Sequence, residues 1–405
     1  MLRPIGRIVP DLPRAIPTFL AACAVVLSAC GSPAANPASS SPSPSATVAA
    51  SPTATSTAMV AATPSRAAAP SAAPIPTAPF AVRPGEPWIV YEGPVATLVG
   101  NRAVRPDGSG DQWLTPEVPL PPKGWQAHPD WSRDGVRLAF AADDAGDPPG
   151  SGTAGEGTRD LWVSRADGTG AERVLDCKDP CTQADDPAWS PDERTLAFVT
   201  WDLRDGKNVG ARLALLDLQT RAVRTLLTVK DDRDAFAWPR WSPDGRRIVL
   251  ERQRWSDLTS NANLIGTTIG VVGVDGPTHT FTQLTDSTLW ATYPDWHPTQ
   301  DLIVFSTRPW DPNATGPDFT GPSNLYTIRP DGSGKTQLTH LGPNDRRAAQ
   351  PTWSPDGRQI IFTLVEGAGF GHPTMATILP DGTGLTSATT SGPMFGTHPR
   401  LRPTP

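Results

Sequence analysis

Short apolar segments of strand length recur from about Glu86 to the C-terminus, and each follows a tryptophan and a polar turn. The motif occurs five times, as PDWSRDGVRLAF (129–140), PAWSPDERTLAF (187–198), PRWSPDGRRIVL (239–250), PDWHPTQDLIVF (294–305) and PTWSPDGRQIIF (351–362). Turns of Pro-Asp-Gly type between apolar segments predict hairpins, because Pro presets φ and Gly accepts a positive φ. Each motif therefore predicts two strands joined by a tight turn.

A second strand–turn–strand pair follows each motif, as in NLYTIRPDGSGKTQLT (324–339). Every unit thus predicts four short strands and leaves little room for a helix. The spacing between motif tryptophans is 52 to 58 residues, the length of a four-stranded propeller blade rather than of a helical repeat. The markers, whose indoles we expect to pack between blades, are Trp131, Trp189, Trp241, Trp296 and Trp353.

The two ends of the repeat region complement each other. PWIVYEG (87–93) and NRAVRPDGSGDQWLT (101–115) match strands two to four of a unit, whose first strand is missing there. HPRLRP (398–403) matches a first strand alone. The sequence therefore predicts an all-β fold, a six-bladed β-propeller over residues 85–405. Its C-terminal strand would close the ring and leave no free sheet edge at the joint.

These repeats resemble those of TolB-like propellers, a WD-repeat-like group, over residues 86–405. The resemblance implies the propeller fold. Some turns depart from the pattern: Arg133 replaces the Pro, PDER near Asp192 replaces Pro-Asp-Gly, and HPTQD near His297 lacks the Ser and the Gly. No helical domain like the one preceding the propeller in the protein that names the family is visible. That protein's particular role is therefore not carried over.

The first thirty residues have the features of an export signal. Arg3, Arg7 and Arg14 precede the apolar run FLAACAVVLSAC (19–30), which is too short to span a bilayer. Its end, LSAC, resembles a bacterial lipoprotein signal. That resemblance implies cleavage before Cys30, a diacylglycerol thioether on Cys30 and N-acylation, for example with palmitate. We expect a signal peptide over 1–29 and a lipid anchor at Cys30; the alternative is an ordinary secretory signal with an incidental cysteine.

Residues 30–84 predict a linker between this anchor and the propeller. They are almost wholly Ala, Pro, Ser and Thr, with Arg66 and Arg83 as the only charges. Such a segment cannot bury enough apolar surface to offset its ordering entropy, and its prolines keep it extended. The sequence therefore predicts an exported chain with a disordered stalk, lipid-anchored to a bacterial membrane on its periplasmic side or at the cell surface.

Long, irregular connections are expected on one face of the propeller and short Asp-Gly turns on the other. The long-connection face is the first candidate binding site, because variable loops on a rigid scaffold often carry function. Trp and Arg side chains commonly anchor interfaces. The candidates are Trp201, Trp255, Trp290, Trp310, Arg252, Arg254 and Arg308, with Trp125 and Trp238 on the same face. The alternative is that several of these side chains cap the core.

The mouth of the central channel is the second candidate. The residue before each marker should point away from the tryptophan and toward the axis, because side chains alternate along a strand. Ala188 and Thr352 hold two of these positions, and the charged members are Asp130, Arg240, Asp295 and Arg400. A ring of mixed charge could hold a polar ligand, a cation or only water.

Other polar residues predict structure rather than chemistry. Cys177 and Cys181, in CKDPC, predict a disulfide in an oxidising compartment. His128 and His398 occupy equivalent repeat positions and are interpreted as architecture. The Asp-Gly pairs indicate turns, because lone carboxylates in separate blades do not converge as a calcium site requires. We expect no metal and no cofactor.

A net charge of -6 argues against a nucleic-acid partner. The chain has no G-x-S-x-G, H-E-x-x-H or P-loop motif, so we predict no catalytic residue and no enzyme activity. The leading hypothesis is a monomeric, non-enzymatic binding or scaffold module for an envelope protein or ligand. The alternative is a carbohydrate-binding or carbohydrate-active propeller.

Overall fold

The computed structural model describes residues 86–404 except for 96–97, 116, 119–123, 144–157, 179–180, 205–206, 257–263, 308–322, 343–345, 367–371 and 388–396. The predicted signal peptide, the lipidation site Cys30 and the linker lie outside the described residues. Throughout the described part of the chain the regular structure is β-strand. We find no helix there that is long and apolar enough to cross a membrane.

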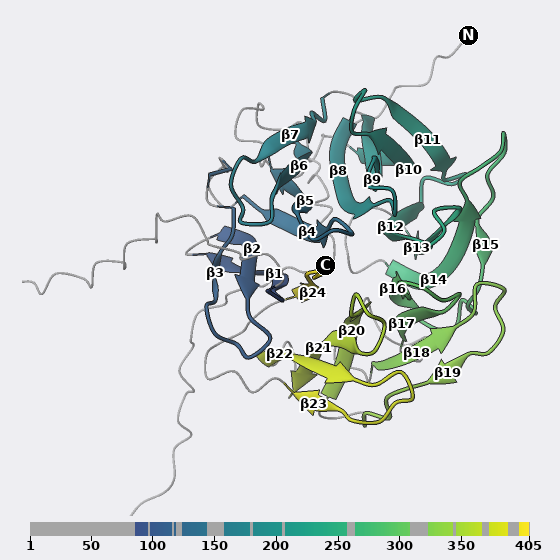
Figure 1. Cartoon of the computed structure of the whole chain (residues 1–405). Coiled ribbons are helices and arrows are strands. Elements are labelled where there is room, and N and C mark those ends of the chain that lie inside the picture. The colour runs from purple at the N-terminus through teal and green to yellow at the C-terminus, as the bar shows by residue number, and fades with distance from the viewer. Residues whose placement is uncertain are drawn as a thin grey trace, which may run out of the picture. The chain divides into compact units, whose positions relative to one another are not determined.

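The strands form antiparallel four-stranded units in which consecutive strands pair, and the first strands of the units surround a common centre (Figure 1). Their bounds are β1 Ile89–Val95, β2 Leu98–Val104, β3 Gln112–Trp113, β4 Gln126–Trp131, β5 Arg137–Asp143, β6 Arg159–Arg165, β7 Glu172–Leu175, β8 Cys181–Trp189, β9 Thr195–Arg204, β10 Lys207–Asp217, β11 Val223–Thr228, β12 Asp234–Trp241, β13 Arg247–Trp255, β14 Leu264–Gly273, β15 Thr282–Gln283, β16 Thr292–Trp296, β17 Ile303–Thr307, β18 Asn324–Ile328, β19 Thr336–Gln337, β20 Arg346–Trp353, β21 Ile360–Glu366, β22 His372–Ile378, β23 Thr386–Ser387 and β24 Thr397–Leu401.

Hydrogen bonding groups these strands into four four-stranded sheets and one eight-stranded sheet. The larger sheet combines β4–β7 with β8–β11, which a parallel pairing of Arg159 with Gln183 connects. Dividing it at that pairing gives six four-stranded blades: β24-β1-β2-β3, β4–β7, β8–β11, β12–β15, β16–β19 and β20–β23. The all-β propeller predicted from the repeats is confirmed.

The first blade takes its innermost strand from the C-terminal end of the chain, as predicted. In β24, Leu401 pairs with Ile89 of β1 and Arg400 pairs with Val90. Arg402 extends the joint, because its backbone N–H donates to the Trp88 carbonyl at 2.6 Å. Its side-chain Nε donates to the Gly135 carbonyl of the second blade at 2.7 Å. The closing segment is therefore bonded to the blades on both sides of the joint.

Three of the five motif tryptophans hydrogen-bond to the preceding blade, whereas the Trp296 indole N–H donates to the Gln300 carbonyl of its own turn at 3.2 Å. The indole N–H of Trp131 donates to the Arg400 carbonyl at 3.1 Å, and that of Trp189 donates to the Asp130 carbonyl at 3.0 Å. Trp241 repeats the pattern with the Ala188 carbonyl at 3.1 Å. In each case the acceptor lies on the innermost strand of the preceding blade. One side chain thus fills the space between two blades and fixes their distance by a directional bond.

The motif turn explains why Ser and Asp recur two residues apart. In the fourth blade the Ser242 hydroxyl donates to the Asp244 carboxylate at 2.5 Å, and the Arg246 N–H donates to the same oxygen at 3.0 Å. Gly245 follows with a φ of +71°, a conformation that a side chain would strain. The carboxylate therefore holds the loop closed from inside, and the Asp-Gly pairs serve turn geometry.

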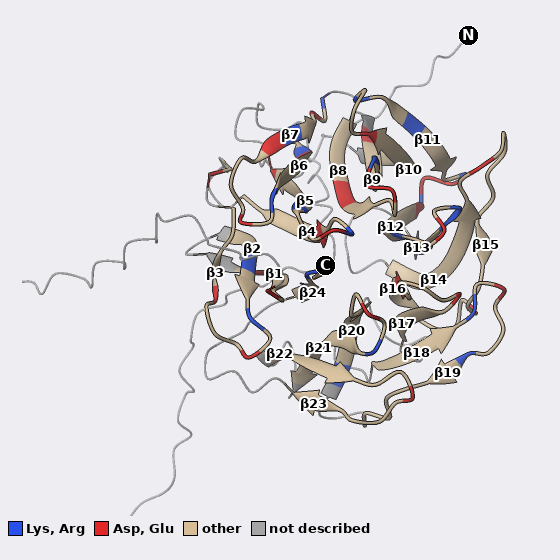
Figure 2. Ribbon diagram, in the orientation of Figure 1, with Lys and Arg blue, Asp and Glu red and all other residues tan. Residues whose placement is uncertain are grey.

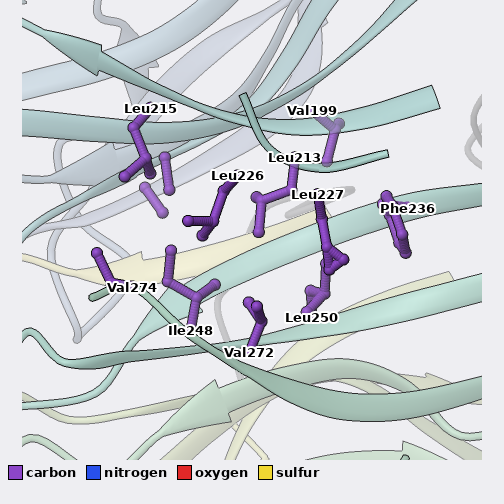
Figure 3. Close-up of a cluster of buried hydrophobic side chains, with 12 residues drawn as sticks. Val199, Leu213, Leu215, Leu226, Leu227, Phe236, Ile248, Leu250, Val272 and Val274 are labelled. Atoms are coloured by element: carbon purple, nitrogen blue, oxygen red, sulfur yellow. The ribbon is translucent and has the colours of Figure 1, made fainter. Parts of the chain in front are cut away.

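The apolar core lies in layers between adjacent blades. Figure 3 shows one layer, in which side chains from β9–β11 face side chains from β12–β14. Its labelled members are Val199, Leu213, Leu215, Leu226, Leu227, Phe236, Ile248, Leu250, Val272 and Val274. Each blade buries both of its faces in this way, because the next blade covers each face in turn.

We predict that deleting residues 397–405 destabilises the whole propeller. The deletion leaves β1 as an unpaired edge and removes the bonds of Arg402 to both adjoining blades. Thermal unfolding followed by circular dichroism should show a large loss of melting temperature or loss of the folded state. Deleting only residues 404–405 is the control and should leave the melt unchanged. A 397–405 deletion that melts like the full chain would contradict the closure.

Candidate functional site

Every innermost strand carries a bulge at the same repeat position. The residue three places before the marker has a positive φ of 52° to 56° and is followed by Pro. These residues are His128, Asp186, Trp238, Tyr293, Gln350 and His398. A left-handed non-glycine residue costs roughly 1–3 kcal/mol, and a following Pro favours an extended conformation instead. The surrounding structure must therefore hold each bulge, and the bulge redirects one side chain per blade.

Bulge side chains from different blades meet at the axis. The Trp238 ring stacks on His398 with centroids 4.3 Å apart and an angle of 20°. His128 meets the same indole edge-on at 4.5 Å, and Tyr293 lies 4.9 Å away. Because these residues come from four blades, their contacts fill the centre of the ring. Trp238 is therefore buried on the axis, and its assignment to the exposed long-connection face was wrong.

The four charged residues predicted at the channel mouth come together as an ion network. Arg400 Nη1 lies 3.1 Å from an Asp295 carboxylate oxygen, and Arg400 Nε lies 3.8 Å from Asp130. Arg240 Nε lies 3.7 Å from Asp295. Both carboxylates also accept backbone N–H bonds, Asp130 from Trp189 at 3.0 Å and Asp295 from Trp353 at 2.8 Å. The network thus locks four blades together with balanced charge.

Burial governs the protonation of this network. It raises the pKa of Asp130, although the nearby Arg240 and Arg400 act in the opposite direction. Burial and the repulsion from Arg400 lower the pKa of Arg240 to about 10. Neutralising either aspartate would leave two buried cations facing a single anion. Such an imbalance is costly in a desolvated site. The network therefore has a structural role, and its residues tolerate few substitutions that change their charge.

A small pocket borders both the aromatic cluster and the ion network. It is lined by Trp238, Tyr293, Pro294, Gln350, Pro351, His398, Pro399 and Arg400. Its water-accessible volume is about 10 Å³, which is room for roughly one water molecule. Among the described residues, this pocket is therefore too small for an organic ligand.

A second polar cluster surrounds His128 at the joint between the first and second blades. Nδ1 of His128 lies 2.5 Å from an Asp185 oxygen and 2.8 Å from an Asp186 oxygen. Its Nε2 faces Glu92 at 3.6 Å, and the same Glu92 oxygen lies 3.0 Å from Nδ1 of His398. All five side chains are buried. In Figure 2, β8 bears an acidic segment, and Asp185 and Asp186 are the only acidic residues of that strand.

These contacts shift the titration of the cluster strongly. Burial alone would lower the pKa of His128, but Asp185, Asp186 and Glu92 outweigh it and raise that pKa well above the ordinary value. Burial likewise opposes ionisation of Glu92, yet the two histidines lower its pKa to about 2. In the absence of another cation, His128 therefore carries the positive charge that its carboxylate neighbours require.

The aromatic candidates of the long-connection face do not form an exposed patch. Trp255 and Trp290 are 6% and 8% exposed, so the expectation that their rings reach a ligand at the surface was wrong. Trp201 is partly buried against the core layer of Figure 3. A tryptophan on a connection becomes buried when other segments cover it. The sequence pattern does not show which segments do so. Trp310 and Arg308 lie outside the described residues.

The arginine candidates lie beside one another on β13 and share an acidic partner. Arg252 and Arg254 both bind the buried carboxylate of Asp234, with a distance of 2.7 Å for Arg254. Arg254 also reaches Asp231 at 3.0 Å. Both guanidinium groups stay partly exposed, so they form a charged rim on this face. The contact with Asp234 gives them a structural role as well.

Cys177 and Cys181 form a disulfide in the structure. Cys177 is buried, and its backbone N–H donates to the Asp160 carboxylate at 2.8 Å. The bridge closes the connection that leads from β7 into β8. It therefore fixes the entry of the strand that carries Asp185 and Asp186.

Sequence reasoning missed the bulge residues as a group. The available signal is the residue before the Pro that opens each motif, where the six blades read HP, DP, WP, YP, QP and HP. His128 and His398 were noted as equivalent positions and assigned to architecture. Strict strand alternation gives no reason to turn these side chains inward, because a bulge breaks that alternation.

The ring of four-stranded sheets and its closure by β24 define a closed β-propeller. Solved structures with a similar fold are known. TolB from Acinetobacter baumannii matches with a TM-score of 0.54 at 14% identity, over 78% of this chain and 66% of that one. A putative TolB from Agrobacterium tumefaciens matches with a TM-score of 0.51 at 18% identity, over 78% and 97%. At these identities the likeness shows the fold alone, and the TolB-like propeller suggested by the repeats is confirmed at that level.

An oligogalacturonate lyase from Vibrio parahaemolyticus also matches, at 17% identity over 75% of this chain and 73% of that one. Its TM-score of 0.45 is too low to support an argument about this protein. No protein-family model matches the sequence, and no curated protein matches it.

We predict that Glu251 makes the propeller less stable as the pH rises. Burial raises its pKa to about 7 from an ordinary value of 4.5, despite hydrogen bonds from Thr292 and Gln253. A raised folded-state pKa gives stability that is complete below the unfolded value and is lost as the pH rises through the folded value. Glu251→Gln removes this loss, which is on the order of 3 kcal/mol.

The melting temperature of Glu251→Gln minus that of the wild type should therefore increase from pH 5 to pH 8. Glu172→Gln, which changes an exposed carboxylate, is the control and should give a flat difference. A flat difference for Glu251→Gln as well would mean that this carboxyl group titrates normally in the folded chain.

Proposed function

We propose that this chain is an extracytoplasmic, lipid-anchored propeller that binds a protein of the bacterial envelope and catalyses no reaction. The observation that carries the proposal is the filled axis. Trp238, His398 and the ion network occupy the centre of the ring and leave room for roughly one water molecule. This pocket is too small for a larger ligand, which favours binding on a face of the propeller, and a broad, rigid face suits a macromolecule.

The long-connection face offers charge for such a contact. Asp231, Arg233 and Arg254 form a partly exposed network, in which Arg233 lies 2.8 Å from Asp231. Charged groups at a rim raise the association rate and orient the partner more than they add affinity. Burial of Trp255 and Trp290 removes two of the rings on which a sugar would stack, so it favours the protein-binding hypothesis over the carbohydrate-binding one.

The anchor rests on the N-terminal sequence. LSAC followed by Gly31 resembles a lipoprotein signal, and the Pro-, Ala- and Ser-rich segment after it would separate the propeller from the membrane. Two or more acyl chains hold a protein on a bilayer stably, since each buried methylene contributes about 0.8 kcal/mol. The similarity of the propeller to TolB structures is compatible with an envelope location. The proposed anchor is argued from the N-terminal sequence and not from that similarity.

Lipidation predicts opposite outcomes for the two cysteines of the signal region. Cys30→Ser should move the chain from the detergent phase to the aqueous phase in phase partitioning, and mass spectrometry should find no acyl groups. Cys23→Ser is the matched control, because Cys23 would be removed with the signal peptide, and it should leave partitioning unchanged. Equal partitioning of the wild type and Cys30→Ser would exclude the anchor.

Binding is tested with the mature chain in detergent. Cross-linking in native envelopes should enrich one protein, excess untagged chain should suppress the enrichment, and the purified pair should bind saturably. The same chain applied to a glycan array should give no saturable binding and no bond cleavage. Saturable binding of one glycan class, without an enriched protein, would replace this proposal by the carbohydrate alternative.

A further inference from the structure

Three side chains at the ring joint direct their ligand atoms at one another. Glu92 lies on β1, His398 on the closing strand β24 and His128 on β4 of the next blade. The Glu92 oxygen is 3.0 Å from Nδ1 of His398 and 3.6 Å from Nε2 of His128, and all three ligand atoms lie within 4.8 Å of one another. Ligand atoms about 2.0–2.2 Å from a common Zn²⁺ would be separated by similar distances.

The outer nitrogens of both rings face groups that fix the ring orientation. Nδ1 of His128 meets the Asp185 carboxylate, which Arg159 holds in turn at 2.5 Å. Metal-binding histidines commonly donate their second N–H to a carboxylate in this way. Nε2 of His398 lies 3.0 Å from the side-chain amide nitrogen of Gln350. A metal on Nδ1 leaves the ring proton on Nε2. Binding therefore requires the Gln350 amide to turn its oxygen toward the ring and to give up the bonds that this oxygen accepts from the His398 N–H at 3.1 Å and the Thr363 hydroxyl at 2.9 Å.

Nδ1 of His398, in a side chain that is 6% exposed, is one of the three atoms that converge. It lies 3.0 Å from the Glu92 oxygen, but not in a direction that gives a well-formed hydrogen bond. An ion placed between these two atoms would give the buried nitrogen a partner in the right direction.

The charge balance of the cluster also calls for a cation. Glu92, Asp143, Asp185 and Asp186 are buried carboxylates, and Arg159 is the guanidinium in contact with Asp143 and Asp185. The remaining negative charge must be offset by a proton on the histidines or by a metal ion, because unpaired buried charge is strongly unfavourable. Two imidazoles and one carboxylate favour a transition metal over Ca²⁺ or Mg²⁺, which prefer oxygen ligands.

We propose that Glu92, His128 and His398 bind one divalent transition-metal ion, with Zn²⁺ as the metal to test, and that this ion clasps the joint of the propeller. It would connect the closing strand, the strand it pairs with and the neighbouring blade. The fourth coordination position would be left to water. The site is independent of the function proposed above, because it lies at the axis and not on a binding face.

The mature chain, stripped with a chelator and kept oxidised so that the disulfide is intact, is titrated with Zn²⁺. We expect one Zn²⁺ per chain after gel filtration and a higher melting temperature that returns to its starting value on chelation, since a ligand of the folded state stabilises it. Glu92→Gln and His398→Gln should each weaken Zn²⁺ binding at least tenfold and abolish the thermal shift.

The double variant His279→Gln/His340→Gln is the control for adventitious binding by histidines outside the cluster, and it should bind Zn²⁺ like the wild type. No bound Zn²⁺ in the wild type, or unchanged affinity in Glu92→Gln, would overturn the proposal. If a variant fails to fold, anomalous diffraction from wild-type crystals soaked in Zn²⁺ decides. A peak among the three residues supports the site, and a peak elsewhere or none refutes it.

Discussion

The antiparallel pairing of β24 with β1 is the constraint on which the remaining structure depends. It closes the ring, and it brings the closing strand against the first and second blades at once. Arg400 enters the ion network and His398 enters the aromatic cluster only because this strand is held in register. The joint is therefore also where the axial chemistry is assembled, and geometry at the axis depends on pairing at the edge.

Within each repeat, different positions form the scaffold and supply the side chains at the axis. Tryptophans, Ser-Asp turns and apolar layers recur with little change, and they set the distance and angle between blades. The bulge position varies freely, from His to Asp, Trp, Tyr and Gln, although the backbone conformation is the same in all six blades. The strained backbone at each bulge is held because the residues before and after it pair with the neighbouring strand. Such strain is common where a fold presents side chains to a site. Changing this one residue in each blade therefore changes which side chains meet at the axis.

The repeats and the complementary chain ends were enough to derive the fold, because strand periodicity and turn chemistry are local. Alternation along a strand also located Asp130, Arg240, Asp295 and Arg400, since the rule holds from the marker tryptophan to its neighbour. The alternation rule fails at the bulge, three residues before the marker. There Trp238, His128 and His398 turn inward without a local signal. Trp255 and Trp290 were misjudged for another reason: burial depends on which segments cover a side chain, and that is a tertiary property.

The separation of the joint along the chain has a consequence for how the protein is made. Thr397 of β24 bonds to Glu92 of β1 across 305 residues, so the first blade is synthesised long before its innermost strand. During that interval an apolar sheet edge stays open, and contacts of such high sequence separation form slowly. For the exported chain proposed above, this stage would fall outside the cytoplasm, where an open edge pairs readily with other chains. The pairing of β24 with β1 is therefore the last strand pairing of the ring that the growing chain can make.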